Sequence, residues 1–123
     1  MIQVNTILDV VDNSGAKKAK CIRILTGYKR KTAKVGDTIV ISVQSARNAG
    51  KVQKGEVHKA VVVRTKKSWE RSSGFGLSFS ENAVVLMGGP EKPMGSRLSG
   101  PVTHELRKRN HSKLFALAAS AAI

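Results

Sequence analysis

Five short segments rich in β-branched residues, separated by turn-forming residues, constrain the fold of this chain more than any other feature. The segments are 6–11, 21–25, 38–43, 57–63 and 82–87. Valine and isoleucine favour strands because branching at Cβ suits a pleated, half-buried surface. The run 12–15, Gly27 and Gly36 favour turns between the segments. About five short strands with turns between them predict a small barrel or a sandwich.

One domain accounts for the whole chain. The 123 residues match the size of one domain, and 41% hydrophobic residues suffice for one core. Aromatic residues make up only 4%, so Val, Ile, Leu and Ala must fill that core. Between two strands, 47–54 is predicted to form a ribbon tip. We predict a single domain, 1–123, with the β-strands and loops over about 1–102 and two short helices over about 103–119.

The charge of the chain restricts its partners. Lys and Arg total 22 against 8 Asp and Glu, which gives a net charge of +14. Such a surface repels itself unless an anionic partner covers it, and the candidates are nucleic acid, an anionic membrane or an acidic protein. The most apolar segment, 114–123, is too short to span a bilayer. Membrane insertion is therefore not expected.

The positive charges form four clusters, which we interpret as phosphate contacts to folded RNA. Each contact releases a counterion, so affinity should fall with salt at a log–log slope of about −0.7 to −0.9 per contact. Sequence-tolerant single-strand binding needs aromatic stacking platforms, and the chain has few aromatic residues. Recognition of RNA shape and backbone fits better. The side chains predicted to contact RNA are Lys17, Lys18, Lys20, Lys29, Arg30, Lys31, Lys51, Lys54, Arg64, Lys66 and Lys67.

Two other classes of function would each need residues of a particular kind. A transient single-strand-binding module would depend on Tyr28 or Trp69 for stacking. An enzyme acting on nucleic acid would need convergent carboxylates or a metal site, but the eight carboxylates are scattered and the three histidines lack metal-ligand spacing. Cys21 is the only cysteine and reads as a small apolar strand residue. No enzymatic activity, metal or cofactor is expected.

Several motifs resemble one family. One part of the chain contains, in order, Ala60–Val63, Ser73–Gly74, Phe79, Asn82 and Val85–Leu86, with nine, four, two and two residues between them. This pattern resembles the signature of universal large-subunit ribosomal protein fourteen. Three further stretches also resemble this family: 12–16, 50–55, and 95–97 together with 100–102. The resemblance runs in order over nearly the whole chain, from Gln3 to about Ala118.

This resemblance implies a fold, a set of partners and a second set of site residues. The fold is a five-stranded β-barrel with a projecting β-ribbon and two short C-terminal helices. The implied partners are large-subunit ribosomal RNA, ribosomal proteins three and nineteen, small-subunit RNA at an intersubunit bridge, and a ribosome-silencing factor. The bridge and factor contacts are expected at Ser96, Arg97, Arg107 and Lys113. Family members usually carry Thr at the position of Ser96.

The compartment is indicated by two segments. Residues 104–111 are similar to the version in plant and algal mitochondria, and 68–72 are unusual for bacterial members. The resemblance therefore favours a mitochondrial ribosome, while bacterial and plastid ribosomes stay open. The chain begins without a basic leader or apolar segment, which fits either synthesis where it works or an import peptide outside this sequence.

Overall fold

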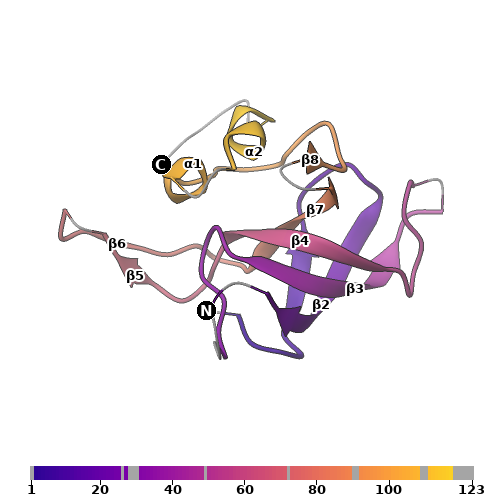
Figure 1. Cartoon of the computed structure of the whole chain (residues 1–123), viewed down its shortest axis with the longest axis horizontal. Helices are drawn as coiled ribbons and strands as arrows, with labels where there is room; N and C mark the ends of the chain where they lie inside the picture. Colours follow the sequence, from indigo (N-terminus) through magenta and orange to yellow (C-terminus); the bar gives the residue numbers. More distant parts are fainter. Residues whose placement is uncertain are drawn as a thin grey trace.

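Five strands close into a barrel (Figure 1). The computed structural model describes residues 2–25, 27, 31–48, 50–71, 73–89, 92–108 and 111–117. The barrel strands, in spatial order, are β1 (Ile7–Val10), β2 (Ala16–Ile24), β3 (Thr38–Ala46), β4 (Val57–Arg64) and β7 (Ala83–Gly89). Neighbours pair antiparallel, and the ring closes where β1 pairs parallel with β7. The predicted small barrel is confirmed, and the sandwich is excluded.

The remaining elements lie outside the ring. A two-stranded ribbon, β5 (Trp69–Glu70) with β6 (Gly76–Leu77), extends away from the barrel (Figure 1). The short β8 (Lys92–Pro93) pairs with the end of β7. The C-terminal part contains α1 (Glu105–Lys108), which is a single turn, and α2 (Ser112–Leu117). No helix in the described part of the chain is long and apolar enough to cross a membrane.

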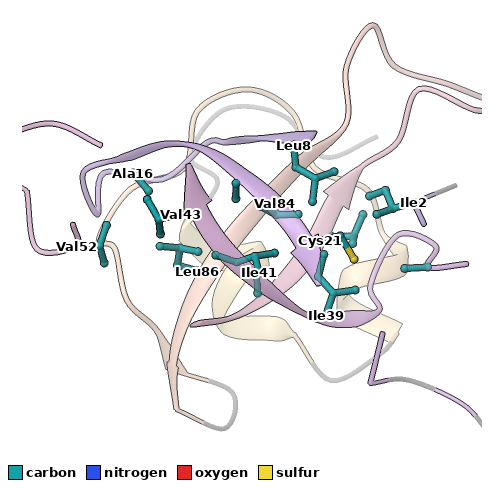
Figure 2. Packing of buried hydrophobic residues seen from close by; sticks show 14 residues of the cluster. Ile2, Leu8, Ala16, Cys21, Ile39, Ile41, Val43, Val52, Val84 and Leu86 are labelled. Carbon is teal, nitrogen blue, oxygen red and sulfur yellow. The ribbon is translucent and has the colours of Figure 1, made fainter. Parts of the chain in front are cut away.

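Side chains from every barrel strand fill the interior (Figure 2). Along β3 the burial alternates, so Ile39, Ile41 and Val43 point inward while their neighbours are partly exposed. This alternation is what a strand with one face on a core requires. Cys21 lies among these residues as a buried free thiol. Each fully buried Val, Leu or Ile contributes about 1.5–3 kcal/mol to folding.

A second apolar cluster explains why β4 and β7 lack this alternation. Val61 lies opposite Val85 on the outer face of the barrel, and Val102, Leu106 and Leu114 cover that face. The C-terminal segment therefore packs on the outside of β4 and β7 (Figure 1). Both faces are buried over Ala60–Val63 of β4 and Ala83–Met87 of β7, so these parts of the sequence are continuous apolar runs. The valine-rich signature segment is thus a consequence of burial on two sides.

Two expectations about local structure need correction. Lys17, Lys18 and Lys20 lie within β2 rather than in a loop before it, because small Ala16 and Ala19 are the residues that face inward. Register irregularities along β2 break the period-two pattern that would have shown this strand in the sequence.

The predicted ribbon tip at 47–54 does not project. This segment joins β3 to β4 and folds back, so that Val52 is buried in the barrel core. Near its end, the backbone N of Gly55 donates to the carbonyl of Val43 at 2.9 Å. The ribbon that extends from the barrel is β5–β6.

Candidate nucleic-acid interface

Three stretches that are far apart in the sequence meet at residues 12–15, which we call the junction turn. Asp12 fixes this turn from within, because its Oδ1 accepts hydrogen bonds from the backbone N of Ser14 at 3.2 Å and from the Ser14 hydroxyl at 2.5 Å. Its Oδ2 accepts the backbone N–H of Leu86 in β7 at 3.1 Å. Hydrogen bonds to a charged acceptor are stronger than neutral ones. The carboxylate therefore ties the junction turn to the barrel wall.

Asn13 positions the second stretch. Its Oδ1 accepts the backbone N–H groups of Ser96 at 2.7 Å and of Arg97 at 3.1 Å, while its Nδ2 donates to the Ser96 hydroxyl at 2.8 Å. A Cβ on Gly95 would lie 2.7 Å from Asn13 Oδ1, so only glycine permits this approach. Ser96 and Arg97 are exposed. Two of the residues predicted for the bridge face are therefore held by the junction turn.

The loop between β3 and β4 docks on the other side of the same turn. Gly15 has a φ of 108° and its Cα lies so close to Gly50 that a Cβ on Gly50 would meet it at 2.6 Å. The backbone N of Lys51 donates to the carbonyl of Ser14 at 2.9 Å, and that of Arg47 donates to the carbonyl of Gly15 at 2.7 Å. These contacts bring Arg47 and Lys51 next to the junction turn.

Cations therefore gather around the junction turn. Lys17, Arg47, Lys51 and Arg97 are all exposed. Lys17 and Arg47 line a groove of about 310 Å³ whose wall also includes the carboxylates of Asp9, Asp12 and Glu81. Reasoning from the sequence missed Arg47, because only the β2–β3 register, in which Ala16 pairs with Ala46, places it beside the turn.

A second group of cations lies where the β5–β6 ribbon leaves the barrel. Lys34, Lys66 and Lys67 are exposed there. Lys34 and Lys67 line a small cavity of about 90 Å³ whose wall includes Trp69. The backbone N of Lys66 donates to Asn82 Oδ1 at 2.8 Å, which fixes the chain at this point. Two surfaces of the barrel are thus cationic.

Several carboxylates in the described part of the chain contact other groups of the protein. Lys18 forms an ion pair with Asp9, and its hydrogen bond lowers the pKa of that carboxyl. The hydrogen bond with Asp9 raises the pKa of the neighbouring Glu81. Glu56 lies 2.8 Å from His58. With these acids used in this way, the protein offers mainly cations to a partner.

Glu105 joins the ribbon to the C-terminal segment. Arg71 donates from Nε and Nη2 to its two carboxylate oxygens at 2.8 and 3.1 Å. Burial of Glu105 acts to raise its pKa, but hydrogen bonds to the carboxylate, chiefly from Arg71, together with the Arg71 charge outweigh burial and lower the pKa from 4.5 to about 2. Paired N–H donors in this geometry make a strong, directional contact. The turn that joins β5 to β6 is therefore tied to α1.

Arg64 stands apart from the other cations predicted to contact RNA. It is 7% exposed, and its Nη2 lies 3.4 Å from Glu81 Oε1. A Cβ on Gly100 would come within 2.0 Å of its Nη1, so the guanidinium lies against the loop that contains Gly100. The structure places this side chain inside the protein, between β4 and that loop.

The other predicted residues are spread over the molecule. Lys31 and Lys54 are exposed, Lys113 is exposed on α2, and Lys20 is partly buried on β2. Arg107 lies in α1. Lys29 and Arg30 lie outside the described residues. The groove beside the junction turn and the cavity beside Trp69 each contain only a few of the predicted residues.

The chemistry that these sites lack is also informative. Among the described residues, no three His, Cys, Asp or Glu side chains come together to hold a metal ion. Fold and surface together define a class: a small closed β-barrel in which most described lysines face outward.

The model of one protein family, described as ribosomal protein L14p/L23e, matches residues 1–122. The chain therefore belongs to this family, as its motifs indicated. The family consists of structural proteins of the large ribosomal subunit rather than enzymes, and its members associate with ribosomal RNA and with other large-subunit proteins.

Proposed function

We propose that this protein holds segments of folded large-subunit ribosomal RNA in place through the two cationic surfaces of its barrel. The proposal rests on how the two kinds of charge are placed: carboxylates contact groups within the chain, and lysines are exposed to solvent. Asp9, Glu81 and Glu105 lie in ion pairs within the chain, and Glu56 contacts His58, whereas most described lysines are exposed. A net charge of +14 on one small domain needs a polyanionic partner to offset its self-repulsion.

The contacts are made mainly to phosphates. The side chains that we assign to them are Lys17, Lys18, Lys20, Lys31, Lys51, Lys54, Lys66 and Lys67, with Lys29 and Arg30 added from the sequence. Arg64 is omitted because its guanidinium lies inside the protein. Since the cations lie on different sides of a rigid barrel, they fix RNA segments relative to one another rather than reading bases.

The face formed by Ser96, Arg97, Arg107 and Lys113 contributes to an intersubunit bridge with small-subunit RNA and receives a ribosome-silencing factor. The hydrogen bonds of Asn13 support this assignment, because they present Ser96 and Arg97 to solvent in one geometry. A loop backbone that is already held in place loses less entropy on binding than a mobile one. The hydroxyl of Ser96 takes part in this contact with Asn13.

Ribosomal proteins three and nineteen are the protein neighbours that we assign, in a ribosome of the bacterial and organellar type. The mitochondrion is the compartment favoured, because residues 104–111 resemble the plant and algal mitochondrial version. Sedimentation of the native protein from purified organelles tests this assignment. Recovery with large subunits from mitochondria supports it, whereas recovery from plastids or cytosol contradicts it.

Salt-dependent binding to deproteinised large-subunit ribosomal RNA tests the RNA assignment. Lys51→Ala and Lys66→Ala, one from each cationic surface, should each reduce the log–log salt slope by about 0.7–0.9. Lys92→Ala is the matched control, since Lys92 is exposed on β8 and outside the proposed set. Equal slopes for all variants would contradict the residue assignment, and absence of binding by the native protein would contradict the function itself.

A further inference from the structure

An aromatic side chain lies at the end of the β5–β6 ribbon with most of its surface in solvent. Phe75 is 75% exposed, more than the other exposed large hydrophobic residues of the described chain. Burying a phenylalanine normally stabilises a fold by about 1.5–3 kcal/mol. A ring left outside in this way therefore contributes little to the stability of the isolated protein and is available to a partner.

The chain neighbours of Phe75 leave most of this residue in solvent. Phe75 lies between Gly74 and Gly76, which have no side chains to cover it. A Cβ built on Gly74 would meet no atom within 4 Å, and one on Gly76 would meet only the carbonyl oxygen of Trp69, at 4.0 Å. The described neighbours further along, Ser73 and Ser78, are small and exposed. The ring is thus a single platform with open space around it.

The turn at the end of the ribbon is also held by hydrogen bonds. The backbone N of Arg71 donates to the carbonyl of Phe75, and that of Gly74 donates to the carbonyl of Arg71, both at 2.9 Å. The Arg71 guanidinium is bound to Glu105 by two hydrogen bonds. Trp69 packs against Phe79, with 6.0 Å between ring centroids. The platform is therefore held in one place before a partner arrives.

We infer that Phe75 stacks on an unpaired or extruded nucleobase of the ribosomal RNA. This inference rests on the proposed RNA-binding function. The cations at the base of the ribbon, Lys66 and Lys67, are exposed and attract the phosphates that accompany a base. A protein socket for an aromatic anchor would favour further exposed apolar residues beside the ring, whereas the chain neighbours of Phe75 are glycines and the next apolar residue, Leu77, is partly buried. Base stacking needs only an open π-face.

Affinity for deproteinised large-subunit ribosomal RNA, measured over a range of salt, tests this inference. Stacking on one base should make Phe75→Ala and Phe75→Leu bind about 5- to 150-fold more weakly, while Phe75→Tyr retains native affinity. The log–log salt slope should stay unchanged, because no phosphate contact is lost. Circular dichroism checks that the variants fold, which the exposed position favours.

The outcomes separate this inference from the function on which it rests. If Phe75→Ala binds as tightly as the native protein, or if Phe75→Leu matches Phe75→Tyr, the stacking role is wrong and RNA binding stands. If the native protein does not bind this RNA, the proposed function is wrong as well.

A second experiment identifies the class of partner in intact large subunits. Benzoylphenylalanine replaces Phe75 during synthesis, and the assembled subunits are irradiated. A covalent product with RNA supports the inference. A product with a neighbouring protein, or no product on RNA, overturns it.

Discussion

The paired hydrogen bonds between Arg71 and Glu105 make stability depend on pH in a way that one substitution can test. Glu105→Gln keeps the shape of the side chain and removes its charge. The fall in the Glu105 pKa from 4.5 to about 2 corresponds to about 3.4 kcal/mol at its limit. Both side chains keep 25% of their surface exposed, so solvent screening reduces the expected effect to about 1–2 kcal/mol.

The sign of the pH dependence follows from the lowered pKa. Because the folded protein binds this proton more weakly than the unfolded chain, the contribution is fully present above about pH 5.5 and is lost as the pH falls towards 2. Glu105→Gln should therefore lower the free energy of unfolding by about 1–2 kcal/mol at pH 7. At pH 3 the difference between native protein and variant should be smaller.

Urea unfolding followed by tryptophan fluorescence measures this difference, since Trp69 is the only tryptophan and lies on the same ribbon. Glu70→Gln is the matched control, because Glu70 is an exposed carboxylate on the neighbouring part of the ribbon. The control should change stability by less than about 0.5 kcal/mol at either pH. An effect of Glu105→Gln that is equal at pH 7 and pH 3 would refute the argument from charge.

Three further predictions concern the junction turn, the bridge face and the core. Gly50→Ala forces a Cβ to 2.6 Å from the backbone of Gly15 and should destabilise the protein by about 2–3 kcal/mol in urea unfolding; a loss below about 0.5 kcal/mol would contradict the close packing. Arg97→Glu should weaken subunit joining or factor docking in a sedimentation assay while the melting temperature stays the same, and unchanged joining and docking would argue against the bridge assignment. Burial raises the pKa of the Cys21 thiol, so a maleimide should label it only as fast as the protein unfolds, and rapid labelling of the native protein would disagree.

The barrel could be predicted because its signals are local. The valine-rich stretch Val61–Val63 by itself predicts a strand. The turn-forming residues at 12–15 by themselves predict a turn. The start of β2 could not be predicted in this way. Its inward-facing residues, Ala16 and Ala19, are small, and the exposed Lys17 and Lys18 between them do not form a strand pattern. The apolar outer face of β4 likewise depends on a segment about 40 residues further along the chain.

The excess of cations in the candidate site could be predicted from the composition. The positions of the individual cations could not. An excess of Lys and Arg is visible in any count, whereas the roles of individual cations depend on non-local contacts. Arg64 resembles its basic neighbours in the sequence, yet its guanidinium lies against Gly100 inside the protein. Arg47 joins the junction turn only through the pairing of β2 with β3. The exposure of Phe75 depends on how the ribbon leaves the barrel.

The C-terminal cover on β4 and β7 has a consequence for biosynthesis. During translation both strands are complete before residues 102–114 emerge, so Val61, Val63 and Val85 form a bare apolar strip on a polycationic chain. Nascent chains with such strips aggregate or adhere to other molecules until the strip is covered. Truncation before Val102 would make that transient state permanent, and we expect the shortened chain to be captured by chaperones and degraded rather than assembled.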